Sequence, residues 1–253
     1  WTNCGAQLTL SRAKLDGTGG TDLRNTTPSG CPWGIDIDHV GHKVYYAEYS
    51  AGGIYRTDMD GSNQTLVNPT GTSAATTPSD IVIDPVSGYL YWSNDSPPRI
   101  GRVQLSNYVG SDFSTAPISP ASINSMIIDR GAGKIYWSDF GHGSAGSAAL
   151  GVANLDGSGS AQDITPGSPW PYGNPQGIAA DLPNNKIYFA SGEAITSMST
   201  TGTSPTDFVQ VPGQWVSTMA ILAPPTNLVA PTVTGTNVVG STLTCSTGDW
   251  EMN

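Results

Sequence analysis

The sequence predicts an all-β protein: a β-propeller of about five four-stranded blades, followed by a short β-rich C-terminal tail. Three observations carry this prediction. An aromatic pair recurs about every 45 residues, a short apolar run precedes each pair, and a third strand-like run ending in a turn follows it. Seven Trp, ten Tyr and many β-branched residues favour strands, and 31 Gly and 19 Pro favour the turns between them.

The aromatic pair marks the second strand of each blade. Its second member falls at positions 1, 46, 92, 137 and 189, so successive copies are 45, 46, 45 and 52 residues apart. The complete pairs are Tyr45-Tyr46, Tyr91-Trp92, Tyr136-Trp137 and Tyr188-Phe189, and Trp1 begins an incomplete fifth copy. Because side chains alternate along a strand, we expect the two members of each pair to point to opposite sides of the blade.

The apolar run ahead of each pair predicts a first strand that is buried on both faces. The runs cover 34–38, 80–84, 125–129 and 177–181, and each ends in aspartate; a weaker copy at 218–222 does not. Because these aspartates recur in register, we expect each to satisfy backbone groups at the end of its own strand.

Third and fourth strands complete each unit. The third strands are predicted at 10–17, 54–61, 100–107, 150–157 and 195–202, several ending in Asp-Gly, which suits a tight turn. Four blades are therefore expected near 26–67, 68–114, 115–165 and 166–210. A fifth blade would combine 217–222 with 1–23, and this closure would pair the open edges of the ring.

An apolar run ending in Asp, a Tyr-Trp-Thr-Asp-like tetrapeptide and an Asp-Gly turn resemble the YWTD repeat of LDL-receptor class B-like propellers. The tetrapeptide at 136–139, YWSD, comes closest, and no copy has all four letters. The resemblance covers 1–222, which is predicted to be the propeller domain. The family typically closes six blades, so five and six blades both stay open.

The tail at 223–253 differs in composition from the repeats. Pro224-Pro225 begins a linker, and the residues after it alternate as strands do. This segment resembles the start of the Ig-like repeats of bacterial cell-surface proteins, and it is predicted to be a linker with a truncated Ig-like segment.

Charge and composition exclude several functions. A net charge of −10 repels phosphate backbones, which argues against a nucleic-acid partner. The sequence has no run of 18 apolar residues, so membrane insertion is not expected. Three scattered His and no acidic cluster of fixed spacing argue against a metal site, and no cofactor is expected. No oligomeric state is predicted.

Candidate ligand-binding residues lie in the loops from strand four to strand one and from strand two to strand three, which open on one face of a propeller. Aromatic rings beside carboxylates and amides can hold a sugar, and the alternative is that the Trp residues simply fill gaps between blades. Asp139 and His142 can form an acid–base pair, or belong to a solvated loop. The candidates are Trp33, Glu48, Tyr49, Asp139, His142, Trp170, Tyr172 and Glu193.

Asp36 breaks the pattern of the first strands. A lone buried carboxylate is costly, so Asp36 implies either a partner or a solvated channel, and it is a candidate channel residue. Its counterparts in the other copies are the apolar Val82, Ile127, Ala179 and Ala220.

Two of the three cysteines are predicted to pair. Cys4 falls in the strand-two-to-three loop of the fifth blade, and Cys31 in the loop that leads from it to the next blade. In a propeller these loops open side by side, so a Cys4–Cys31 disulfide is expected, with Cys245 unpaired; the alternative is three free thiols. The disulfide would place the protein in an oxidising compartment, either secreted or on the cell surface.

Two functions follow from these observations. The first is an extracellular, non-catalytic binding or adhesion module that recognises a glycan or a protein through the loop face. The alternative is a secreted hydrolase or lyase with a pocket at the top of the propeller, which rests on fold analogy. No organised nucleophile and base are found in the sequence, so no catalytic residue is assigned and binding is favoured.

Overall fold

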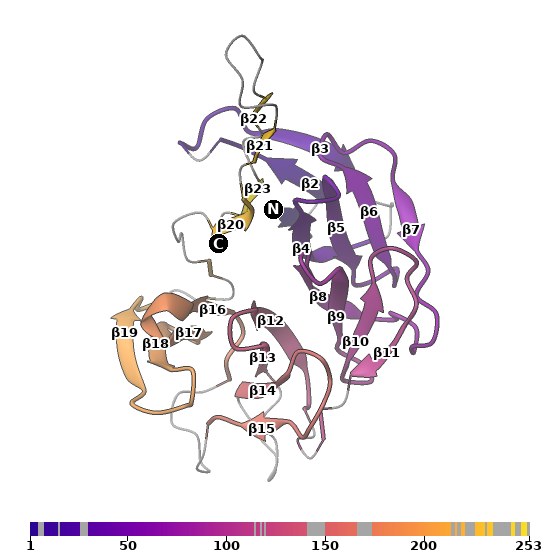
Figure 1. Cartoon of the computed structure of the whole chain (residues 1–253). Helices are drawn as coiled ribbons and strands as arrows, with labels where there is room; N and C mark the ends of the chain where they lie inside the picture. Colours follow the sequence, from indigo (N-terminus) through magenta and orange to yellow (C-terminus); the bar gives the residue numbers. More distant parts are fainter. Residues whose placement is uncertain are drawn as a thin grey trace.

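A computed structural model describes residues 1–4, 8–14, 16–25, 30–113, 115–116, 118, 120–140, 150–165, 174–213, 216, 219–220, 226–230, 232–234, 244–245 and 249–251. Within these residues, five antiparallel sheets stand around a common centre as the blades of a propeller (Figure 1). The predicted all-β, five-bladed β-propeller is confirmed. Two short strand pairs form the tail.

The blades follow one another in chain order. Blade I consists of β1 (Thr2–Asn3), β2 (Thr9–Arg12) and β3 (Thr21–Asn25). Blade II consists of β4 (Pro32–Asp38), β5 (Lys43–Glu48), β6 (Ile54–Asp58) and β7 (Thr65–Val67). Blade III consists of β8 (Pro78–Asp84), β9 (Tyr89–Asn94), β10 (Arg99–Gln104) and β11 (Gly110–Phe113).

The last two blades and the tail complete the order. Blade IV consists of β12 (Ile123–Asp129), β13 (Lys134–Asp139), β14 (Leu150–Asn154) and β15 (Gln162–Asp163). Blade V consists of β16 (Ile178–Asp181), the 3₁₀ turn η1 (Leu182–Asn184), β17 (Lys186–Ser191), β18 (Ala194–Ser199) and β19 (Thr206–Gln210). In the tail, β20 (Thr226–Val229) pairs with β23 (Asp249–Glu251), and β21 (Val233–Thr234) with β22 (Thr244–Cys245).

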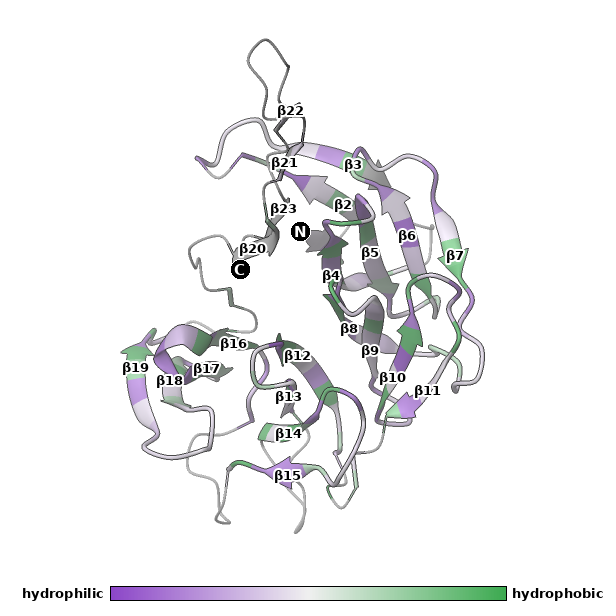
Figure 2. Ribbon diagram, viewed as in Figure 1, coloured by the Kyte–Doolittle hydropathy of each residue, from purple (hydrophilic) through white to green (hydrophobic). Residues whose placement is uncertain are grey.

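The first strands of the blades lie at the centre. β4 packs against β8, β8 against β12, and β12 against β16, while β1 packs against β4. Hydrophilic residues mark outer strands such as β11 and β15 (Figure 2). In blade I, β1 pairs with β2 as β5 pairs with β6, so β1 is the counterpart of a second strand. Of the strand predicted at 217–222, the described residues 219–220 belong to no strand, and the others lie outside the described residues.

The aromatic pairs occupy equivalent positions, as predicted. Tyr45 pairs with Asp36 on the neighbouring first strand. In the same way, Tyr91 pairs with Val82, Tyr136 with Ile127 and Tyr188 with Ala179. The second aromatics Tyr46, Trp92, Trp137 and Phe189 are fully buried. Trp92, Trp137 and Phe189 belong to three apolar clusters, so the periodic part of the sequence is also the core of the fold.

Three of the four aspartates at the ends of the first strands, Asp38, Asp84 and Asp129, bond nearby backbone N–H groups, as predicted. Asp181 instead accepts from the side chain of Asn184. Asp38 Oδ1 accepts the N–H groups of Val40 and Gly41 at 3.1 and 2.8 Å. Asp84 Oδ1 also accepts from Arg130 Nε at 2.9 Å, which joins blade III to blade IV.

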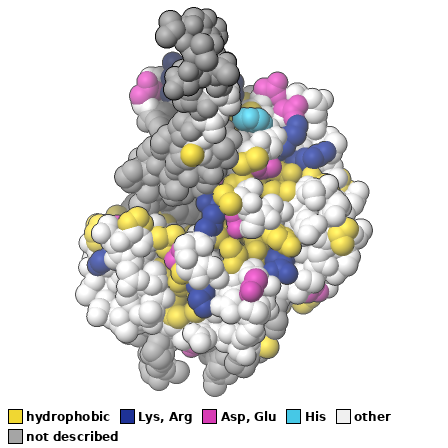
Figure 3. Space-filling model, viewed as in Figure 1, with side chains coloured by type: hydrophobic (Ala, Val, Ile, Leu, Met, Phe, Trp, Pro, Cys, Tyr) yellow, Lys and Arg dark blue, Asp and Glu magenta, His cyan; other side chains and the backbone are white. Residues whose placement is uncertain are grey.

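On the face shown in Figure 3, Lys and Arg side chains lie among hydrophobic ones.

Candidate functional site

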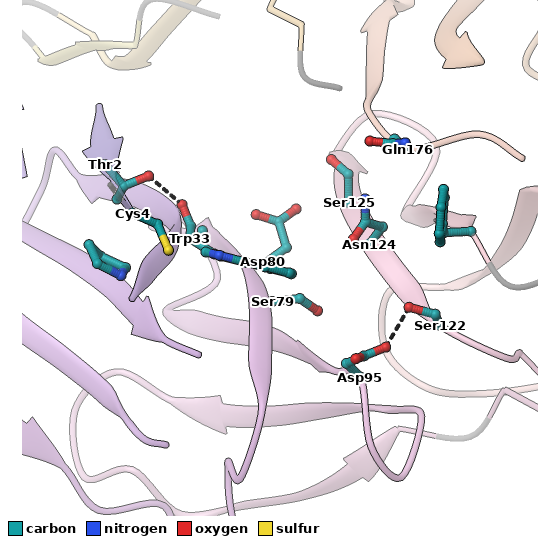
Figure 4. Close-up of a pocket in the computed structure, with 13 residues that line it drawn as sticks. Thr2, Cys4, Trp33, Ser79, Asp80, Asp95, Ser122, Asn124, Ser125 and Gln176 are labelled. Carbon is teal, nitrogen blue, oxygen red and sulfur yellow. Dashed lines mark hydrogen bonds between the residues drawn. The ribbon is translucent and has the colours of Figure 1, made fainter. Parts of the chain in front are cut away.

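A cavity of about 580 Å³ opens at the centre of the propeller, where the first strands begin (Figure 4). Blade I contributes to it from β1, blades II to IV from the starts of their first strands and from the loops around them, and blade V from the residue two positions before β16. The lining residues are Thr2, Cys4, Pro32, Trp33, Gly34, Ser79, Asp80, Asp95, Ser122, Asn124, Ser125, Phe140 and Gln176.

Four lining residues occupy the same repeat position in successive blades. Each lies two residues before the first-strand residue that pairs with the buried second aromatic of its blade. They are Trp33, Ser79, Asn124 and Gln176. The repeat therefore places one side chain from each of blades II to V around the cavity, whatever its type.

Trp33 forms a fixed aromatic wall of the cavity. Its ring stacks on Tyr49 with centroids 4.0 Å apart and planes 15° from parallel, and 40% of the residue stays exposed. Its Nε1–H donates to Cys31 Sγ at 2.9 Å, and Thr2 Oγ1 donates to its carbonyl at 2.6 Å. Because these contacts hold Trp33 before any ligand arrives, little side-chain entropy is lost on binding.

Asp95 joins three blades at the rim. Tyr49 OH donates to Asp95 Oδ2 at 2.6 Å, and Ser122 Oγ donates to Asp95 Oδ1. The hydrogen bond to this carboxylate raises the pKa of Tyr49, because it stabilises the protonated phenol. Trp33, Tyr49, Asp95 and Ser122 thus form a connected rim from blade II to blade IV.

Asp80 lies deeper, on β8. Its Oδ2 accepts the N–H of Met126 on β12 at 2.7 Å, and Figure 4 shows its carboxylate directed into the space between Trp33 and Ser125. Blade II comes very close, since a β-carbon on Gly34 would lie 2.5 Å from Asp80 Cα. Loss of water around this carboxylate raises the pKa of Asp80 to about 7, and the negative charge of Asp36 adds to the effect.

Asp36 has a partner in the neighbouring blade. Its Oδ2 accepts the N–H of Ile83 at 2.7 Å, and its Oδ1 accepts the N–H of Ile37 at 2.8 Å. Asp36 and Asp80 therefore do the same work one blade apart, since each carboxylate binds a backbone N–H of the next first strand. Of the two possibilities considered for Asp36, a partner is the one found.

Glu48 and Asp139 lie beneath the loop face. Both are fully buried, at equivalent ends of β5 and β13. The Asp139 carboxylate accepts the N–H of Ala121 at 2.9 Å and that of Ser122 at 2.8 Å, so it holds the loop that leads into β12. Glu193 is exposed in the turn between β17 and β18. The candidates His142, Trp170 and Tyr172 lie outside the described residues.

The predicted disulfide between Cys4 and Cys31 is confirmed, with Cα atoms 4.7 Å apart. It ties the end of β1 to the start of β4, and Cys4 itself lines the cavity. The bond therefore holds blade I and Trp33 in place together.

Sequence reasoning missed several lining residues. Asp80, Asn124, Phe140 and Gln176 were not among the candidates. For three of them, the repeat register is the signal that could have found them. Asn124 and Gln176 share the repeat position of Trp33, and Phe140 shares that of Tyr49.

The described residues hold no group of three or more His, Cys, Asp or Glu that suits a metal ion. Among these same residues, no helix is long and apolar enough to cross a membrane. What the cavity offers is an aromatic wall, two carboxylates, and amide and hydroxyl groups, which is the chemistry of a binding site.

No protein-family model matches the chain. Over 187 residues it is 24% identical to low-density lipoprotein receptor-related protein 1 of Pyricularia oryzae, a match that covers 62% of this chain and 59% of that relative. The chain thus spans less than two thirds of this relative. The relative supports the resemblance to YWTD, LDL-receptor class B-like propellers.

Solved structures share the fold. The nidogen/laminin complex matches with a TM-score of 0.72 and 20% identity, over 87% of this chain and 78% of that one. A gluconolactonase of Xanthomonas campestris matches with a TM-score of 0.63 and 16% identity, over 84% and 75%. A streptogramin B lyase matches with a TM-score of 0.61 and 18% identity, over 86% and 67%. The Ig-like resemblance of the tail stays a prediction.

Proposed function

We propose that the protein is an extracellular, non-catalytic binding module that holds a protein ligand at the central cavity. The observation that carries this proposal is the wall formed by Trp33, which is rigidly held by Tyr49 and Cys31 and yet 40% exposed to the cavity. Exposed aromatic rings in preformed concave sites are typical anchors of protein interfaces.

The rim supports the same function. Asp95 is fixed by two hydroxyl donors, and the amides of Asn124 and Gln176 line the cavity from two further blades. Such groups can pair with the backbone of an extended ligand segment without being reorganised first. The Cys4–Cys31 disulfide favours an oxidising, extracellular setting.

A protein ligand is favoured over a glycan by one comparison. The structural neighbour with a TM-score of 0.72 is nidogen in a complex with laminin, which is a complex between proteins. Glycan recognition remains the competing outcome of the experiment below.

A displayed library of random peptides and a glycan array, screened in parallel with the whole chain, test the function. We expect peptide binders whose affinity falls at least about tenfold in Trp33→Ala, a loss of about 1.4 kcal/mol or more. Phe208→Ala is the matched control, because Phe208 is 64% exposed on β19 and does not line the cavity. Binding that is indifferent to Trp33→Ala, or binding to glycans alone, would overturn the proposal.

A secreted hydrolase or lyase is the second candidate. Asp80 favours it, because a carboxyl group with a pKa of about 7 in a cavity suits a general base. A panel of lactone and ester substrates tests this role. Turnover by the parent chain that is lost in Asp80→Asn would establish it, and absence of turnover across the panel would leave binding as the function.

A further inference from the structure

We propose that the central cavity receives a positively charged side chain, a lysine or arginine of the protein ligand, with Asp80 as its counter-ion and Trp33 as its stacking wall. This inference rests on the proposed binding function and assigns the chemistry of the ligand group.

The charge of the cavity is one-sided. Its lining contains the carboxylates of Asp80 and Asp95, and none of the described lining residues is Lys, Arg or His. Two basic side chains of the described residues form salt bridges, and both do so away from the cavity: Lys43 binds Asp58, and Arg130 binds Asp84. A positive charge in the cavity would therefore come from the ligand.

Of the two carboxylates, Asp80 is the better counter-ion. Asp95 accepts hydroxyl hydrogens on both oxygens, from Tyr49 and Ser122, and serves as a structural link of the rim. Asp80 accepts the backbone N–H groups of Met126 and Ile81 and a hydrogen bond from the Ser125 side chain, so about one of the roughly four acceptor sites of a carboxylate is left for a ligand. Its carboxylate is also directed into the cavity (Figure 4).

The charge of Asp80 is under-compensated. Hydrogen bonds from neighbouring groups favour its ionised form, yet burial outweighs them and raises the pKa of Asp80 to about 7. An ammonium or guanidinium group placed beside it would restore the missing positive charge and form charge-assisted hydrogen bonds.

The aromatic wall suits the rest of such a side chain. Trp33 and Phe140 line the cavity and are 40% and 38% exposed. The methylene stem of a lysine or arginine packs on apolar surface, and the charged end is attracted to the face of an indole. The same cavity thus offers surface for the stem and a carboxylate for the head.

The test uses three small probes on the whole chain: the amides of Nα-acetyl-lysine, Nα-acetyl-arginine and the neutral Nα-acetyl-norleucine, titrated by NMR at pH 8. We expect at least one cationic probe to bind about tenfold or more tightly than the norleucine probe. This preference should vanish in Asp80→Asn, an isosteric change, and remain in Phe208→Ala.

The wild-type chain gives a second readout that needs no variant. The titratable groups that face Asp80 from neighbouring elements are Asp36 on β4 and Asp95 after β9. The lining residues of β12 and the residue before β16 contribute no titratable group. Because Asp80 gains its proton near pH 7, the preference for the cationic probe should fall between pH 8 and pH 6.

The outcomes separate the inference from the function it rests on. A norleucine probe that binds as tightly as the cationic ones, a preference that survives in Asp80→Asn, or probes that do not bind at all overturn the inference. The binding function would still stand if library-derived ligands lost affinity in Trp33→Ala. It falls if that variant binds them as the parent chain does, or if the chain binds glycans alone.

Discussion

Trp92 lies over Gly101 on the neighbouring strand so closely that a β-carbon on Gly101 would come within 2.1 Å of Trp92 Cζ2. Blade IV repeats the arrangement, with Gly151 as near to the ring of Trp137. Where the buried aromatic is smaller, the facing residue has a side chain: Tyr46 stacks on Tyr55, and Phe189 faces Thr196. The size of the buried ring thus determines whether the facing residue on the next strand can have a side chain.

Gly101→Ala is expected to lower the free energy of unfolding by about 1–3 kcal/mol, since Trp92 is fully buried and has no room to move. Urea denaturation measures the change. Gly20→Ala is the control, because a β-carbon there meets nothing within 4 Å. Equal stability of Gly101→Ala and the parent would show that the strands separate more easily than the packing indicates.

Trp137→Ala is expected to cost about 3–5 kcal/mol, because a fully buried ring leaves a cavity. In a Trp137→Phe background, Gly151→Ala should be less harmful than in the parent, since a smaller ring leaves room for the methyl group. A double-mutant cycle by denaturation measures this coupling. Additive effects would mean that Gly151 is required for a reason other than the indole.

Loss of the Cys4–Cys31 bond is expected to cost about 3–4 kcal/mol, because the cross-link closes a segment with a sequence separation of 27. Thermal unfolding of Cys31→Ser gives the value, with Cys245→Ser as the control that leaves the bond intact. Peptide mapping without reductant should recover Cys4 and Cys31 together. A bridge from Cys4 to Cys245 would contradict the structure.

Asp80→Asn is expected to stabilise the fold at neutral and alkaline pH. The pKa of Asp80 is raised in the folded state to about 7, from about 4 when unfolded, so the folded chain holds the proton more tightly. The penalty of ionising Asp80 is therefore absent below about pH 4, grows as the pH rises to 7, and is constant above it, at roughly a few kcal/mol. Denaturation of both proteins from pH 4 to 8 measures the difference, and a gap independent of pH would refute this prediction.

Asp139→Ala is expected to cost about 1–3 kcal/mol, because the fully buried carboxylate is lost and the N–H groups of Ala121 and Ser122 lose their acceptor. Glu193→Ala, at an exposed carboxylate, should stay within about 0.5 kcal/mol of the parent. Unfolding curves decide between them. If Asp139→Ala were as stable as the parent but bound a library-derived ligand less tightly, Asp139 would belong to the binding site instead.

The blades could be predicted from the sequence because the packing of every blade requires large apolar residues at the same positions of the repeat. Positions such as Tyr91 and Trp92 must be large and apolar, so their spacing records the strands. The cavity leaves no such record, since its equivalent positions hold Trp33, Ser79, Asn124 and Gln176, of which two alone, the amides Asn124 and Gln176, are chemically alike. Register identifies them only once the strands are aligned.

Carboxylates were harder to place than aromatics. Glu48 and Asp139 stand where the chain leaves a second strand, and sequence alone does not reveal whether such a side chain turns outward or back into the loop below. Burial settles the direction for both residues. No pattern of composition or spacing in the sequence marks Asp80 as a cavity residue. Its distinctive feature is its closeness to Gly34 of another blade, which only the folded structure shows.

The four equivalent positions at the cavity are separate from the apolar core. Each of these side chains stands in a different blade, and none of the four belongs to the apolar clusters that hold the blades together. Combinatorial diversification of residues 33, 124 and 176 would therefore change the lining of the cavity and leave the apolar clusters unchanged. Ser79 differs from these three, because it is buried and its Oγ donates to the carbonyl of Ile123 at 2.8 Å, which joins blade III to blade IV. The lining of the cavity can thus change at three positions while the residues that form the blades stay the same.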